Sequence, residues 1–211
     1  MSALSVFNSI PMEKNGAIRL KIILGSTRPK RFSEKAGAWI TGLAKSRPEF
    51  AVEVLDLRDY LLPYYEESMS PSQLKVGEYK NETVNAWGRK IEEGDAFLIV
   101  APEYNHGYSA VLKNALDYVY APWNNKPVAF VSYGSVGGGR SVEQLRGVAV
   151  ELQMAPIRQA VHIQAPWMLV DEKNELKTGV LDPYVESAGG MLKQLLWWGK
   201  TLKVGRATIS A

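Results

Sequence analysis

Short apolar runs alternate along the chain with stretches in which apolar residues recur at helical spacing. Positions 96–101 are almost continuously apolar, which is typical of a strand that is buried on both faces of a sheet. This alternation predicts an α/β protein whose parallel sheet is covered by helices on both faces. The expected strands are 18–24, 51–57, 96–101, 127–133 and about 157–163, and the expected helices are 33–46, 79–94, 110–120, 141–154 and 183 to about 204.

Residues typical of helix ends mark three of these boundaries. Ser33 precedes the first helical stretch, and we expect its hydroxyl to cap that helix. Asp182 and Pro183 have the order of an N-cap followed by a proline at the first helical position. Gly94 is expected to end the second helix just before the third strand.

Five strands with intervening helices can be wound as a flavodoxin-like or a Rossmann-type sheet. Both arrangements bind ligands beyond the carboxyl ends of the strands, at the switch in strand order. The loops after the first, third and fourth strands are therefore the places to look for chemistry. No repeat, low-complexity tract or linker is visible, so we expect one domain over 18–211, preceded by a short, frayed extension at residues 1–17.

Composition narrows the possible classes of function. Apolar residues make up 46% and charged residues 22% of the 211 residues, which is ordinary for a globular protein and argues against disorder. The net charge of +3 is small and the basic residues are scattered, which argues against a nucleic-acid-binding face. The chain has no cysteine and two histidines, so thiol chemistry is excluded and a multi-histidine metal site is not expected. No run suits a membrane span or a signal peptide, and we expect a cytoplasmic protein without a membrane partner.

The loop 25–33 leads from the first strand into the first helix. Backbone N–H groups and the positive end of the helix dipole make such a junction a site for anions. Its hydroxyl and guanidinium groups are donors suited to a phosphate, and they belong to Ser26, Thr27, Ser33, Arg28 and Arg31. The loop contains neither the G-x-G-x-x-G fingerprint nor a P-loop sequence. A polar turn with solvated arginines is the alternative, but two arginines and three hydroxyls exceed what a turn needs.

The loops after the third and fourth strands differ from the first in their chemistry. Positions 101–109 combine proline and glycine with Tyr104 and Tyr108, either of which could cover a flat ring; aromatic packing of a tight turn is the alternative. Positions 132–140 contain four glycines within six residues, which costs backbone entropy unless a ligand approaches the main chain closely. A flexible loop is the alternative there. Taken together, the three loops predict a site for a mononucleotide with a large planar head.

Three motifs in these loops resemble those of the NADPH-dependent FMN reductase family, which includes azoreductases, quinone reductases and chromate-reducing flavoproteins. They are G-S-T-R-x-x-R-x-S at 25–33, P-E-Y-N-x-G-Y at 102–108 and S-x-G-x-x-G-G at 132–138. The resemblance implies a flavodoxin-like, three-layer α/β/α fold with a five-stranded parallel sheet of order 2-1-3-4-5. It also implies a homodimer or homotetramer with non-covalently bound FMN.

The resemblance assigns site residues position by position. The phosphate loop would contribute Ser26, Arg28, Arg31, Phe32 and Ser33, where Arg31 replaces a small hydroxyl residue found in many relatives. The isoalloxazine ring would contact Pro102, Glu103, Tyr104, Asn105 and Gly107 on one side and Ser132, Gly134, Gly137 and Gly138 at its other edge.

The implied activity is a ping-pong oxidoreductase reaction. NAD(P)H, as co-substrate, would deliver hydride to flavin N5, and a quinone or a similar acceptor (a flavin, azo compound or metal oxyanion) would then be reduced. No acid–base side chain is required, so we assign no catalytic residue and no metal. A flavodoxin-type electron carrier without direct NAD(P)H oxidation is the rival reading, although such carriers tend to be strongly acidic and this chain is not.

Individual residues outside this assignment carry weaker expectations. His106 is a candidate proton donor to a reduced quinone, but a lone loop histidine is more often a partly exposed hydrogen-bonding residue. We expect the backbone rather than the carboxylate of Glu103 to face the flavin, because a free carboxylate would repel the reduced ring. Trp197 and Trp198 are expected on the buried face of the last helix, with a subunit interface as the alternative. Trp123 is a candidate wall of the acceptor pocket.

Overall fold

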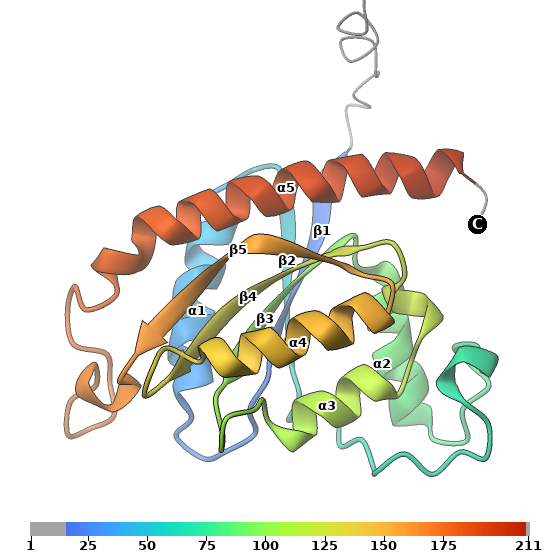
Figure 1. The fold of residues 1–211 in the computed structure, drawn as a ribbon, viewed down its shortest axis with the longest axis horizontal. Coiled ribbons are helices and arrows are strands. Elements are labelled where there is room, and N and C mark those ends of the chain that lie inside the picture. Colours follow the sequence, from blue (N-terminus) through green and yellow to red (C-terminus); the bar gives the residue numbers. More distant parts are fainter. Residues whose placement is uncertain (1–15, 210–211) are drawn as a thin grey trace, which may run out of the picture.

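The computed structural model describes residues 16–209, so most of the expected amino-terminal extension lies outside the described residues. A single five-stranded parallel sheet forms the centre of the protein, with the strand order β2-β1-β3-β4-β5 (Figure 1). This order confirms the flavodoxin-like arrangement and excludes the Rossmann alternative. The strands are β1 (Ile18–Leu24), β2 (Phe50–Asp56), β3 (Ala96–Pro102), β4 (Pro127–Gly134) and β5 (Ala155–Gln164).

Five α-helices cover the two faces of this sheet. Helices α1 and α5 pack on one face, in a core that includes Ile40 and Leu195, while α2, α3 and α4 pack on the other around Trp87 and Leu116 (Figure 1). All seven residues of the central strand β3 are buried, which explains why its sequence is apolar without alternation. The helices are α1 (Phe32–Lys45), α2 (Glu82–Glu93), α3 (Ala110–Asp117), α4 (Gly139–Glu151) and α5 (Val185–Thr208).

Every expected strand and helix is present, with ends shifted by a few residues, but two of the expected helix starts are wrong. Arg31 is the N-cap of α1 and makes no side-chain cap, while Ser33 lies inside the first turn. Asp182 and Pro183 form a short 3₁₀ turn, Asp182–Tyr184, and α5 begins after it at Val185. Gly94 ends α2 as expected, where its N–H donates to the carbonyl of Ile91 at 3.1 Å.

Two tryptophan expectations also require correction. Trp123 is fully buried in the core, with its ring 4.8 Å from that of Phe97, and it lies just before β4 at the opposite edge of the sheet from the loops of interest. It therefore cannot line an acceptor pocket there. Trp197 is 59% exposed on α5, so it is not part of the buried face of that helix.

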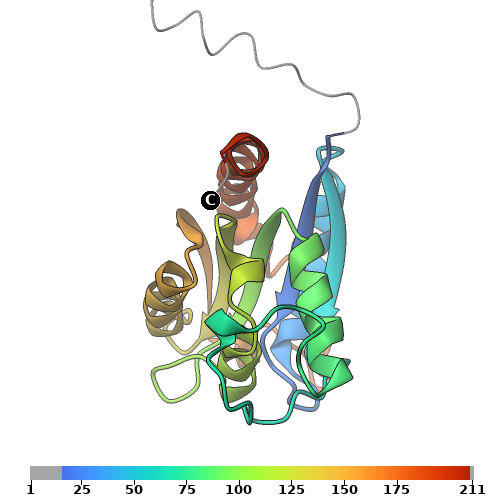
Figure 2. The ribbon, with the colours of Figure 1, turned by 90° about the vertical axis from the view of Figure 1, so that its right-hand side faces the viewer.

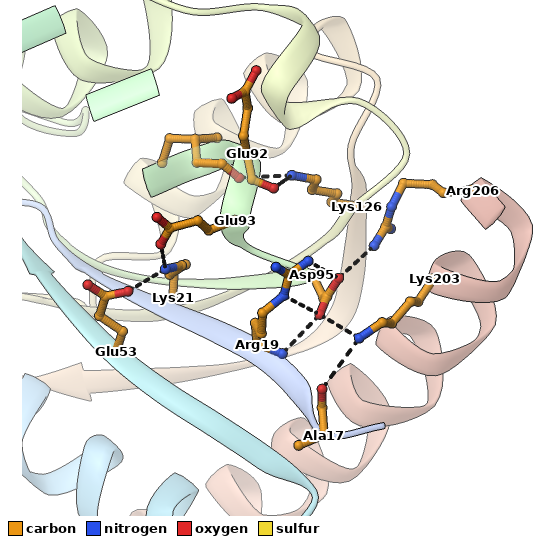
Figure 3. A network of polar contacts seen from close by, with 11 residues as sticks. Ala17, Arg19, Lys21, Glu53, Glu92, Glu93, Asp95, Lys126, Lys203 and Arg206 are labelled. Atoms are coloured by element: carbon orange, nitrogen blue, oxygen red, sulfur yellow. Dashed lines mark hydrogen bonds and ion pairs between the residues drawn. The ribbon is translucent and has the colours of Figure 1, made fainter. Parts of the chain in front are cut away.

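A polar network ties α5 to the amino edge of the sheet (Figure 3). The buried carboxylate of Asp95, just before β3, binds Arg19 of β1 and both Lys203 and Arg206 of α5. Burial raises the pKa of Asp95, but hydrogen bonds from these cations outweigh it and lower that pKa to about 2. Lys126 lies beside this network and donates to the carbonyls of residues 91 and 92 at the end of α2.

The carboxyl ends of the parallel strands gather at the opposite edge (Figure 2). The loops that follow β1, β3 and β4 therefore lie at one edge, as the strand pattern predicts. No helix within residues 16–209 is both long enough and apolar enough to cross a membrane.

Candidate functional site

The loop after β1 begins with a glycine that lies tightly against β3. The N–H of Gly25 donates to the carbonyl of Val100 at 2.9 Å, and an added Cβ would lie 2.9 Å from that same oxygen. Any side chain here would push the loop away from the sheet. The hydroxyl of Ser109, the N-cap of α3, donates to the carbonyl of Gly25. The sequence analysis missed Ser109, although a serine directly before a helical stretch is a recognisable capping signal.

Arg31 lies behind the loop with its donors already used. The residue is 4% exposed, and its guanidinium binds both carboxylate oxygens of Asp56, at the end of β2, as well as the carbonyl of Ser26. Burial raises the pKa of Asp56, but the hydrogen bonds from Arg31 outweigh it and hold that pKa below its usual value. The expected direct contact between Arg31 and a phosphate does not fit this geometry.

Arg58, which the sequence analysis did not single out, supports the same loop from the same side. Its guanidinium donates to the carbonyl of Thr27 at 3.3 Å and to that of Arg28 at 2.5 Å. Arg31 thus holds the carbonyl of Ser26, and Arg58 holds that of Thr27. Because a trans peptide places each C=O opposite to the N–H of the next residue, the N–H groups of Thr27 and Arg28 point away from Arg31 and Arg58. The two arginines therefore orient the N–H groups of the loop toward one side.

Two buried hydroxyls lie at the N-terminus of α1. The Ser33 hydroxyl and the Tyr133 hydroxyl are buried and have no hydrogen-bond partner within residues 16–209. The first turn of α1 has no side-chain cap either. A buried hydroxyl without a partner costs free energy, and a helix N-terminus attracts anions. The Ser33 hydroxyl and the helix N–H groups fit a phosphate, which would accept hydrogen bonds from them.

Tyr104 connects the loop after β3 to the loop after β1. Its hydroxyl forms a 2.8 Å hydrogen bond with the hydroxyl of Ser26, and the guanidinium carbon of Arg28 lies 5.6 Å from the centre of its ring. Tyr108 instead packs against the core on the α2–α4 face. Of the two tyrosines, Tyr104 is therefore the one at the site.

The residues after Tyr104 form a tight two-residue hairpin. Tyr104 and Gly107 exchange two backbone hydrogen bonds, of 2.7 and 3.0 Å, and Asn105 and His106 at the tip both have positive φ angles, of 50° and 68°. The N–H groups of the two tip residues thus stay outside the hydrogen bonds of the turn. The tip is exposed, and the carbonyl of His106 accepts a 2.9 Å hydrogen bond from Gln144 of α4.

Glu103 is oriented differently from the expectation. Its N–H donates to the carbonyl of Tyr133 at 2.9 Å, so that group is not free to face a flavin. Its carboxylate is 5% exposed, pairs with the Arg140 guanidinium at 2.6 Å and accepts from the Arg140 N–H at 3.2 Å. A carboxylate therefore occupies the N-terminus of α4, and its charge is balanced by Arg140. The sequence analysis did not single out Arg140 and missed this pair.

Ser132 supports the glycine-rich loop from below. The side chain is fully buried, and its hydroxyl bonds to the carbonyl of Gly137 at 2.7 Å and to Nδ1 of His162 at 2.8 Å. Gly137 and Gly138 have φ angles of +82° and +78°, and a Cβ on Gly138 would lie 2.7 Å from that of Ser132. The glycines are thus required by the turn itself as well as by any close approach of a ligand. Burial lowers the pKa of His162, which fits a structural role.

The three loops thus meet at one edge of the sheet. Comparison with known proteins identifies the family in which this arrangement occurs. Residues 18–167 match the family model described as NADPH-dependent FMN reductase. The chain belongs to this family. The match confirms the resemblance inferred from the loop motifs and favours a reductase over a flavodoxin-type electron carrier.

Individual relatives agree with this family membership. An NAD(P)H-dependent FMN reductase of Schizosaccharomyces pombe is 37% identical over 170 residues, which cover 80% of each chain. An NADPH:quinone oxidoreductase of Arabidopsis thaliana is 36% identical over 142 residues, which cover 65% of this chain and 69% of the relative. Among solved structures, the flavoenzyme FerB from Paracoccus denitrificans, an NAD(P)H:(acceptor) oxidoreductase, has the same fold, with a TM-score of 0.68 at 20% identity over 88% of this chain and 98% of that one.

Proposed function

We propose that the protein is an NAD(P)H-dependent oxidoreductase that holds FMN at the carboxyl edge of its sheet and reduces quinones or similar small acceptors. The observation that carries the proposal is the buried hydroxyl of Ser33, which has no partner within residues 16–209 and lies at an uncapped helix N-terminus in a member of the FMN reductase family. An electron carrier would need the same phosphate site, so the family membership decides between the two functions.

The phosphate end of the cofactor belongs at the N-terminus of α1. Ser33, the backbone after Ser26 and the exposed guanidinium of Arg28 are the donors there, and Phe32 closes the apolar side next to them. Arg31 acts from behind, by holding the carbonyl of Ser26. Its contribution is the shape of the loop, since its charge is balanced by Asp56.

The ring end belongs between the hairpin after β3 and the glycine loop after β4. Pro102, Tyr104, Asn105 and Gly107 line the first side, and the backbone of Gly134, Gly137 and Gly138 lines the second. Glu103 and Ser132, which were expected to touch the ring, instead hold these two loops in place through Arg140 and the carbonyl of Gly137.

Bound FMN supplies reversible hydride acceptance, a chemistry that no side chain of this protein offers. The protein orients the partners and stabilises the negative charge of the reduced state. The tip N–H groups of Asn105 and His106, which are outside the hydrogen bonds of their turn, are donors of the required kind. The Glu103 carboxylate does not oppose this charge, because Arg140 neutralises it.

Three features of the wider protein complete the proposal. The acceptor is a quinone or a similar flat molecule. The similarity to an NADPH:quinone oxidoreductase supports this class of acceptor. The protein works in the cytoplasm, which suits a chain without cysteine. It assembles as a homodimer or homotetramer, and the exposed Trp197 on α5 supports a contact between subunits.

Anaerobic reduction tests the proposal directly. The purified protein is loaded with FMN and mixed with NADPH or NADH in the absence of oxygen, and the visible band of oxidised flavin is followed. We expect the band to bleach and then to return when a quinone is added. A band that persists with both nucleotides but bleaches with dithionite would identify an electron carrier instead.

A further inference from the structure

Tyr133 is placed at the phosphate end of the site by a strand that contributes no residue to the phosphate loop. It lies near the end of β4, and its ring packs against that of Phe32, the first residue of α1, with 5.2 Å between ring centres. The residue is 6% exposed. This packing fixes the ring beneath the first turn of α1, so that the hydroxyl group has little freedom to seek another partner.

The surroundings of the Tyr133 hydroxyl are polar but do not satisfy it. Within residues 16–209 it has no hydrogen-bond partner, and neither has the hydroxyl of Ser33. The Ser33 side chain and backbone and the Ser26 hydroxyl lie close enough to offset part of the effect of burial on the pKa of Tyr133, but none of them meets hydrogen-bond geometry with its hydroxyl. The Ser26 hydroxyl is already engaged with Tyr104, at 2.8 Å. Burial raises the pKa of Tyr133 to about 12, so the group is a protonated donor at neutral pH.

An unsatisfied buried hydroxyl is a cost that a phenylalanine at the same position would avoid. The ring alone would supply the packing against Phe32, and the oxygen adds nothing to the protein's own hydrogen bonds. A ligand atom that accepts from the hydroxyl accounts for its presence. Because the hydroxyl lies beside Ser33 at the α1 N-terminus, that atom belongs to an anion rather than to the flavin ring.

We propose that the Tyr133 hydroxyl donates a hydrogen bond to the terminal phosphate of FMN, together with Ser33. Tyr133 is then a cofactor-binding residue that reaches the phosphate from the far side of β3. It lies outside the phosphate-loop motif, and this inference rests on the proposed function. The donor would select a phosphate ester over a flavin that lacks one, because a hydrogen bond to a charged group is stronger than one to a neutral group.

The test is the substitution Tyr133→Phe, which keeps the ring and removes one oxygen. Flavin is removed from the wild-type protein and the variant, and each is titrated with FMN and with riboflavin while flavin fluorescence is followed. We expect the dissociation constant for FMN to rise about tenfold or more, and that for riboflavin to stay unchanged. An FMN affinity within about twofold of the wild type would overturn the assignment of Tyr133.

Two further measurements keep this result separate from other failures. Without flavin, Tyr133→Phe should melt at the same temperature as the wild type or higher, because only an unsatisfied hydroxyl is lost. Tyr118→Phe is the matched control: Tyr118 is also buried, but its hydroxyl donates to the carbonyl of Tyr64 at 3.0 Å, so this variant should melt lower and bind FMN normally. Wild-type protein that binds riboflavin as tightly as FMN would contradict the phosphate site of the proposed function itself.

Discussion

The guanidinium of Arg31 binds both carboxylate oxygens of Asp56 behind the loop that follows β1. The arginine side chain is 1% exposed and the aspartate side chain 24%, so the pair is largely shielded from water. Arg31 also holds the carbonyl of Ser26, which couples the end of β2 to the shape of the loop. An arginine of the loop that we propose binds the phosphate thus acts as a brace for the backbone, and its charge is balanced by Asp56.

Removal of the aspartate tests this brace. Asp56→Asn should destabilise the flavin-free protein by about 3 kcal/mol, near the lower end for a broken buried ion pair, because Asp56 is partly exposed. It should also weaken FMN binding, since Arg31 would no longer hold the Ser26 carbonyl. Urea denaturation and flavin titration measure the two effects. The control is Asp117→Asn, which breaks an exposed pair with Lys113 on α3 and should change stability by less than about 0.5 kcal/mol. Equal stabilities of the two variants would show that the brace is unimportant.

Arg28 is the exposed arginine of this loop, and its guanidinium carbon lies 5.6 Å from the centre of the Tyr104 ring. Arg28→Ala should raise the dissociation constant for FMN about tenfold, because a charge-assisted hydrogen bond to phosphate is lost. The visible spectrum of bound flavin should hardly change, since the ring lies elsewhere. Equilibrium titration measures the affinity, and Lys45→Ala, at the other end of α1, is the control for the loss of one positive charge. An unchanged affinity in Arg28→Ala would remove this residue from the phosphate site.

The glycine loop allows a matched pair of substitutions around one helix. Gly138→Ala should destabilise the protein by at least about 2 kcal/mol, because its φ is +78° and the new Cβ would lie 2.7 Å from that of Ser132. Gly147→Ala, at an exposed position inside α4 where the added Cβ would meet no atom of residues 16–209 beyond the helix's own backbone within 4 Å, should stabilise the protein by about 0.5–1 kcal/mol. Thermal unfolding gives both values. Gly138→Ala with wild-type stability and flavin affinity would mean that the loop adapts freely.

The arrangement of the sheet could be predicted from the sequence because its signal is local. The continuous apolar run of β3 and the alternation of strands with helices required no knowledge of distant contacts. The three loops at the carboxyl edge followed from the topology of parallel strands. Motif residues such as Gly25 and Gly138 could be selected because a close approach of the backbone or a positive φ angle favours glycine, which the sequence shows directly.

The supporting contacts of the site could not be predicted, because each joins two elements that are far apart in the sequence. Arg58 reaches back to the carbonyls of Thr27 and Arg28, and Glu103 reaches forward to Arg140. Sequence spacing alone does not show which polar side chain faces a loop from another strand. For the same reason, Arg31 was assigned to the phosphate when its partner, Asp56, lies at the end of a different strand.

A pH dependence is expected at the opposite edge of the sheet, at Lys126. The side chain is buried, donates to the carbonyls of Ile91 and Glu92 at 2.8 and 3.0 Å, and lies near Arg206, Arg19 and Asp95 (Figure 3). Burial, with a smaller contribution from Arg206, lowers the pKa of Lys126 from 10.5 to about 7.

The sign of the effect follows from proton linkage. Above pH 7 the folded protein releases this proton while the unfolded chain keeps it up to about pH 10.4, so Lys126 makes the protein more stable as the pH rises through this interval. Urea denaturation at several pH values should show that the stability of the wild type relative to Lys126→Met increases by a few kcal/mol, on the order of 3, between neutral and alkaline pH. The comparison between the two proteins removes the contributions of the other lysines and of the tyrosines. A stability difference that is constant across this range would mean that Lys126 stays charged, and that the carbonyls at the end of α2 together with Asp95 compensate fully for its burial.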